Sequence, residues 1–133
     1  MDTKVKAKTR RQLIGLLSVL ALEFIFGVIL TTLINFDPTK QSTVQTVFIV
    51  IHIIIGLGIT IGALIQLVVS LKNRYLRGAS TVGLISVLGA MTTGSIAARD
   101  SANTAVFLMA LFFLIAFAAY GYGLVTMDKK QAV

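Results

Sequence analysis

Four long apolar runs dominate this sequence and limit the folds open to it. Each run is about as long as a helix needs to be to cross a bilayer, at a rise of about 1.5 Å per residue. We expect an all-α, four-transmembrane-helix antiparallel bundle whose helices are 13–36, 44–71, 79–98 and 102–127. With 56% hydrophobic and 13% charged residues, the chain has too much apolar surface for one water-soluble core. The connectors are short, so residues 1–133 are predicted to form a single integral membrane domain.

Lysine and arginine gather on one side of the predicted membrane. Ten of the twelve lie in the two tails and the second connector, against Lys40 and Arg99 on the other side. Cytoplasmic flanks of membrane proteins carry such an excess. We therefore expect a multi-pass protein of the cell membrane with both termini in the cytoplasm. The net charge of +7 comes from these flanks and predicts contact with anionic headgroups of the lipid bilayer, not with nucleic acid.

Small and polar residues at helical spacing predict how the second and third helices pack. The two stripes are Gln45, His52, Gly56, Ala63, Gln66 and Ser70 on the second helix, and Ala79, Gly83, Ser86, Ala90, Thr93 and Ala97 on the third. We expect these two faces to meet inside the bundle. On the fourth helix, Tyr120 and Tyr122 lie near the predicted cytoplasmic end, where tyrosines anchor helices at the headgroup level.

Glu23 is the most informative polar residue, because it interrupts the first apolar run near the predicted middle of the membrane. A charged side chain there costs about 2.5 to 3.5 kcal/mol on insertion scales, and low dielectric favours the neutral acid. One interpretation is functional: a proton carrier, a counter-ion to a cationic ligand, or a group that orients a second residue. The other is structural: a neutral acid hydrogen-bonded to Gln66, Ser86, a tyrosine or a backbone carbonyl.

His52 is the only histidine of the chain. Counting residues from the predicted helix ends places Glu23 one or two turns deeper than His52, so a direct bond requires a favourable tilt, and otherwise a water or a ligand bridges them. Met91 and Met109 are predicted at nearly the same depth as His52. A histidine facing a methionine can ligate a b-type haem or a cuprous ion, although methionine also fills gaps in apolar cores. A homodimer would bring two copies of His52 together.

Sequence patterns of enzyme chemistry are absent. The chain has no cysteine, no HExxH, no phosphate-binding glycine loop and no cluster of carboxylates. We therefore predict no catalytic residues, no metal site and no enzymatic activity. Our hypothesis is a membrane binding module for a hydrophobic cofactor or ligand, of the haem or quinone type, around His52 and Glu23, with Gln66 as a further candidate. The alternatives are a proton-coupled small transporter or channel that uses Glu23, and an accessory subunit of a larger membrane complex.

Three short stretches resemble a group of small bacterial four-helix membrane proteins without an assigned activity. They are LEFIFG at 22–27, HIIIGLG at 52–58 and AAYGYGL at 118–124. The resemblance covers most of the chain and implies the same membrane fold, but it implies no reaction or cofactor. Many members of the group have a longer first outer loop and an Asn-Gly pair near the end of the third helix, where this chain has Thr93, Gly94 and Ser95.

Overall fold

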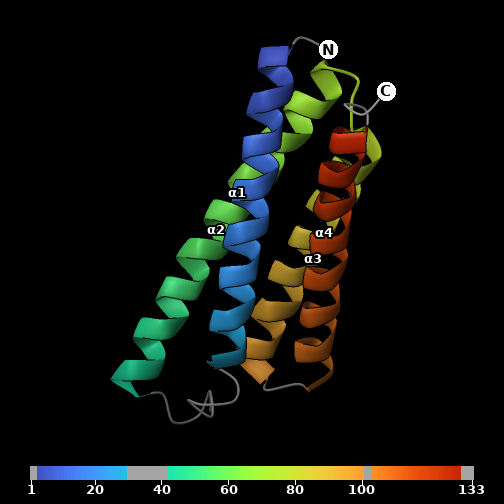
Figure 1. Ribbon diagram of the computed structural model, residues 1–133. Helices are drawn as coiled ribbons and strands as arrows, with labels where there is room; N and C mark the ends of the chain where they lie inside the picture. Colours follow the sequence, from blue (N-terminus) through green and yellow to red (C-terminus); the bar gives the residue numbers. More distant parts are fainter. Residues whose placement is uncertain (1–2, 30–41, 101–102, 130–133) are drawn as a thin grey trace.

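Four helices make up the fold in the computed structural model, which describes residues 3–29, 42–100 and 103–129 (Figure 1). In chain order they are α1 (Thr3–Val28), α2 (Thr43–Lys72), α3 (Arg77–Asp100) and α4 (Asn103–Lys129). The described residues include no strand. Each helix contains a segment that is long and apolar enough to cross a membrane. The prediction of an all-α protein with four membrane-length helices is confirmed.

Helix α1 is the one element whose bounds differ greatly from the prediction. It begins at Thr3, ten residues earlier than predicted, whereas the other three helices agree with the predicted bounds to within two residues at each end. The basic residues of the predicted tail are good helix formers, and no glycine or proline interrupts them. The predicted end of this helix, at residue 36, lies outside the described residues.

Both ends of α2 are fixed by local interactions. The side chain of Ser42 accepts a hydrogen bond from the backbone N–H of Gln45, and the Ser42 N–H donates to Gln45 Oε1, which together form a capping box. At the other end, the side chain of Asn73 donates to a carbonyl of the last turn at 2.8 Å. Arg74 and Leu76 then adopt positive φ angles of 53° and 57°. These left-handed residues reverse the chain, so α3 starts beside the end of α2.

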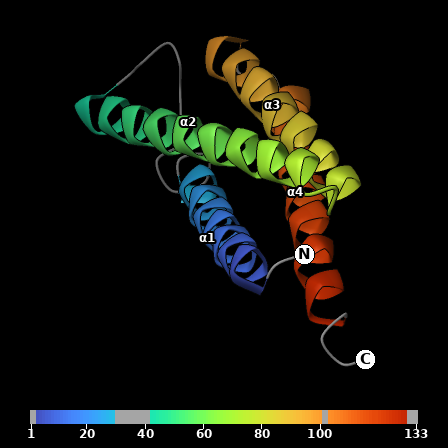
Figure 2. The same cartoon turned by 90° about the horizontal axis from the view of Figure 1, so that it is seen from above.

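The helices form a ring in which each packs on its neighbours in the chain and α1 closes on α4. The interface between α3 and α4 is the most extensive. Figure 2 shows α2 running obliquely across the other helices. Its N-terminal end stands well apart from α4, at the end of the molecule opposite both termini (Figure 1). The bundle is therefore compact near the termini and splayed at the other end.

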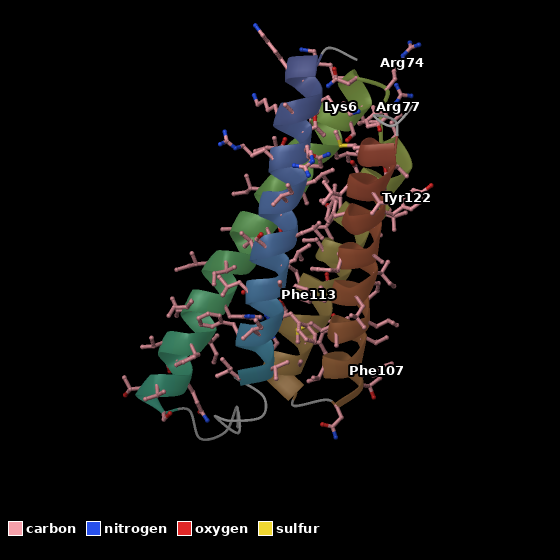
Figure 3. The ribbon with its side chains drawn as sticks, in the orientation of Figure 1. Lys6, Arg74, Arg77, Phe107, Phe113 and Tyr122 are labelled. Carbon is pink, nitrogen blue, oxygen red and sulfur yellow. The ribbon has the colours of Figure 1, made fainter. Side chains whose placement is uncertain are left out.

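The apolar core contains residues from all four helices: Leu13, Leu16, Leu20, Ile59, Ala63, Leu84, Val87, Ala116, Tyr120 and Met127. Tyr120 is completely buried among the helices and is therefore not an exposed anchor. Its ring fits against α3 because Gly83 has no side chain there. Tyr122, two residues on, is 67% exposed and faces outward, as an interfacial anchor would (Figure 3).

The small residues of α3 pack mainly against α4 rather than against α2. A Cβ atom on Gly89 would lie 2.9 Å from the ring of Phe112, and one on Gly94 would lie 3.0 Å from Met109 Sδ. Gly83, which belongs to the predicted α3 stripe, also faces α4, at the ring of Tyr120, and so does not meet α2 as predicted. The helices α2 and α3 do meet near the connector, where Ser70 of the α2 stripe shares a hydrogen bond of 2.7 Å with Ser80. Large side chains of α4, such as Phe112 and Met109, fill the space beside the glycines of α3.

The outward faces of the helices carry large apolar side chains, such as Ile54, Ile85 and Leu114, each at least 60% exposed. Basic side chains gather at the end that holds both termini, where Figure 3 labels Lys6, Arg74 and Arg77. This surface, apolar along the sides and basic at one end, suits a bilayer.

Candidate ligand cavity and the pair Glu23 and His52

Glu23 and His52 lie side by side. Glu23 Oε1 is 3.0 Å from His52 Nδ1, and the glutamate is 2% exposed against 22% for the histidine. The contact agrees with the prediction that a direct bond requires a favourable tilt, since α2 runs obliquely across the other helices (Figure 2). No bridging water or ligand is needed between these two atoms.

Two glycines make this approach fit sterically. Gly27 lies one turn after Glu23, and Gly56 lies one turn after His52. Since α1 and α2 are antiparallel, each glycine faces the polar residue of the other helix. A Cβ on Gly56 would lie 3.3 Å from Glu23 Oε1, and one on Gly27 would lie 3.8 Å from His52 Cε1. Without a side chain at position 56 the glutamate has room to reach α2.

The pair leaves polar atoms unsatisfied. Glu23 Oε2 is buried and has no hydrogen-bond partner among the described residues. His52 Nδ1 is at hydrogen-bonding distance from Oε1, but the ring is not oriented for a hydrogen bond of regular geometry. Buried polar groups normally have hydrogen-bond partners, so Glu23 Oε2 keeps an unused capacity to form a hydrogen bond.

A cavity of about 610 Å³ opens beside the pair and lies between all four helices. Its volume is in the range of small-molecule sites, about 300 to 1,000 Å³. Leu20, Ile59, Val87 and Ala116 belong both to its lining and to the apolar core, so the core closes the cavity toward the end that holds the termini. Phe113, labelled in Figure 3, adds an aromatic wall from α4.

The far end of the cavity is polar. Ser95 and Arg99 line it near the C-terminal end of α3, and Asn103 lines it at the start of α4. Ser95 Oγ donates to the carbonyl of Met91 at 2.9 Å, which leaves its lone pairs available. Sequence reasoning did not select Arg99 or Asn103 as site residues. The one signal was that Arg99 is a cation on the predicted outer side, where few occur.

The two methionines line the cavity, but their sulfur atoms contact other groups. Met91 Sδ accepts a hydrogen bond from Thr60 Oγ1 at 2.8 Å, two turns of α2 beyond His52. Met109 Sδ packs against α3 at Gly94. Both residues therefore line the same cavity as His52, but their sulfur atoms are directed at Thr60 and Gly94.

Gln66 lies apart from this site. It is fully buried, its side-chain nitrogen donates to Ser70 Oγ at 3.4 Å, and Ser70 in turn bonds to Ser80. Along α2, Ala63 lies between Gln66 and Ile59, which lines the closed end of the cavity. The predicted hydrogen bond between Glu23 and Gln66 is therefore not formed, because the two residues occupy opposite halves of the bundle.

Comparison with known proteins finds no matching protein family, no matching curated protein and no matching solved structure. The resemblance to small bacterial four-helix membrane proteins stays a prediction. Among the described residues, no three histidine, cysteine or acidic side chains gather as a metal site would require. The chemistry of the cavity is therefore inferred from its own residues.

The arrangement combines an apolar chamber with an acid and a base at one wall. His52 Nδ1 faces Glu23, so Nε2 is the ring nitrogen that a ligand can use. Carboxylates that hold one nitrogen of a histidine fix the tautomer and orientation of the ring and strengthen the other nitrogen as a ligand. The site can thus bind a metal centre through Nε2, or donate and accept hydrogen bonds with a carbonyl or hydroxyl group.

Proposed function

We propose that this chain is a non-enzymatic membrane protein that binds a hydrophobic cofactor or ligand, of the haem or quinone type, in the cavity beside Glu23 and His52. The observation that carries the proposal is a chamber of about 610 Å³ with apolar walls and a buried acid–base pair that lacks a full set of partners. Ligand sites commonly combine apolar walls with a few convergent polar groups. In this topology both termini are cytoplasmic and the cavity lies in the outer half of the membrane.

His52 is the proposed contact with the ligand, and Glu23 is its positioning partner. In the haem version Nε2 ligates the iron, and in the quinone version it forms a hydrogen bond to a ring oxygen. Glu23 Oε2 offers a second acceptor, or a donor when the acid is neutral. The contact of Met91 with Thr60 makes Met91 a poorer axial ligand than His52. A second histidine ligand would come from another copy of the chain.

A proton-coupled transporter or channel has less support. A proton that leaves Glu23 toward the termini must pass the packed side chains of Leu16, Leu20 and Ile59 before it reaches Gln66. The third hypothesis, an accessory subunit of a larger complex, gives the cavity no role. A membrane binding module gives a role both to the cavity and to the pair Glu23 and His52.

The test is to identify and then titrate the ligand. The protein is purified in mild detergent, and the compounds that co-purify are identified by mass spectrometry and visible absorption. Haem and a decyl-substituted benzoquinone are then titrated separately. We expect at least one of them to bind, His52→Ala to abolish binding, and Glu23→Gln to weaken it by about tenfold, a typical effect of losing the partner of a ligating histidine.

Two phenylalanine substitutions separate the cavity from the outer surface. Ala98 lines the cavity and is exposed, so Ala98→Phe should fill space without disturbing the core. Ala118 is also exposed but is not part of the lining, so Ala118→Phe is the matched control. We expect about tenfold weaker binding for the first and no change for the second. Binding that survives both His52→Ala and Ala98→Phe, or no binding of either compound by the wild type, contradicts the proposal.

A further inference from the structure

We infer that the ligand of this cavity is an anionic amphiphile, with a carboxylate or phosphate group held at Arg99 and a hydrophobic body in the chamber. The inference rests on the proposed function and narrows it. It selects ligands such as haem, whose propionates are anionic, or a fatty acid, over a neutral quinone. Three features of the described residues support it: the charge of the lining, the donors near Arg99 and the apolar depth of the chamber.

The first feature is the charge at the polar end of the lining. Glu23 lies 3.0 Å from His52 at one wall of the cavity. Of the residues that line the cavity in the described part of the chain, Arg99 is the one that stays charged at any physiological pH. The polar end of the lining therefore carries the permanent positive charge of Arg99.

The second feature is the set of donors around that charge. The guanidinium of Arg99 offers a fork of N–H groups that matches a carboxylate or a phosphate. Asn103 contributes a side-chain amide at the same end of the cavity. Charge-assisted hydrogen bonds of this kind are stronger than neutral ones. This end therefore fits an anion better than a carbonyl.

The third feature is the position of Arg99 relative to the apolar chamber. Arg99 lies one residue before the end of α3, so it belongs to the rim, whereas Leu20, Ile59 and Val87 lie at the closed end. An amphiphile with its charged group at the rim would place its hydrophobic body toward these residues. The same arrangement accounts for a cation on the predicted outer side, where the topology otherwise disfavours one.

The experiment compares charged and neutral members of two matched pairs in nanodiscs of phosphatidylcholine. The pairs are haem with haem dimethyl ester, read by absorption, and oleic acid with oleyl alcohol, read with radiolabelled compounds. For at least one pair, we expect the wild type to bind the acid at least tenfold more tightly than its neutral partner. Arg99→Gln should remove this preference, and Arg99→Lys should keep most of it. Lys72→Gln, which removes an equal charge from an exposed residue outside the cavity, should leave it unchanged.

The outcomes separate the inference from the function on which it rests. Equal binding of acid and neutral partner by the wild type, or a preference that survives Arg99→Gln, overturns the inference while the cavity still binds ligand. If the wild type binds none of the four compounds, both the inference and the proposed function are overturned for these compounds. The pair that shows the preference identifies whether the anion belongs to a porphyrin or to an acyl chain.

Discussion

The ring of Tyr120 lies against the backbone of α3 at Gly83, where any side chain would overlap it. Tyr120 is fully buried, and its hydroxyl has no hydrogen-bond partner among the described residues. The contact therefore depends on shape rather than on a polar bond. At the level of single residues, glycine positions decide where large or polar side chains enter this bundle, as Gly56 does for Glu23.

Gly83→Ala should destabilise the protein by about 1 to 3 kcal/mol, because the new methyl group would lie 2.6 Å from Tyr120 Cε1 and must displace the ring. Gly58→Ala is the control, since nothing lies within 4 Å of its Cβ position and alanine favours helix. Unfolding by SDS, followed by far-ultraviolet circular dichroism, measures both. Equal stability of the two variants would show that the ring is not confined at this position.

The residues of the candidate site could be predicted, but their contact could not. Glu23 and His52 stand out as rare polar groups in apolar runs, and both line the cavity. Their adjacency depends on how α1 and α2 are placed along each other and on the inclination of α2, and hydropathy gives neither. Arg99 was counted only as a flanking charge, because its relation to the cavity arises when α3 and α4 pack together.

Among the secondary-structure elements, the connector between α2 and α3 carries the clearest local strain. Arg74 and Leu76 both adopt left-handed conformations that disfavour side chains with a Cβ atom. Leu76 packs against the core, and this contact offsets the steric cost of its conformation. Arg74 is exposed, so its conformation has no such compensation from packing.

Arg74→Gly should therefore stabilise the protein by about 1 kcal/mol, because glycine adopts a positive φ without steric cost. Arg74→Ala removes the same charge but keeps the Cβ atom, so it should not show this gain. Thermal unfolding of the three proteins in one detergent measures the difference. If the glycine and alanine variants unfold at the same temperature, the strain at this residue is negligible.

The bounds of α2, α3 and α4 followed from the apolar runs because charged or capping residues stand at their ends. For α1 the same rule failed, since basic residues continue a helix as readily as they end a membrane span. Hydropathy locates the part of a helix that contacts lipid, whereas backbone propensity determines how far the helix extends into water.

For the whole molecule, the predicted topology can be tested with thiol chemistry, because the chain contains no cysteine. Single substitutions at the exposed positions Lys8, Arg74 and Thr43 each create one reactive site. In intact cells, a membrane-impermeant maleimide should label Thr43→Cys and should not label Lys8→Cys or Arg74→Cys until the membrane is permeabilised. Labelling of Lys8→Cys or Arg74→Cys before permeabilisation would contradict cytoplasmic termini.

The oblique course of α2 has a further consequence at this scale. A helix of 30 residues is about 45 Å long, whereas the hydrocarbon layer is about 30 Å thick, so inclination keeps more of its apolar length within that layer. The inclination also makes the end of the molecule opposite the termini broader than the end that holds them (Figure 1). A tapered inclusion occupies more area in one leaflet than in the other. The protein should therefore prefer curved lipid surfaces, with its broad end in the convex leaflet.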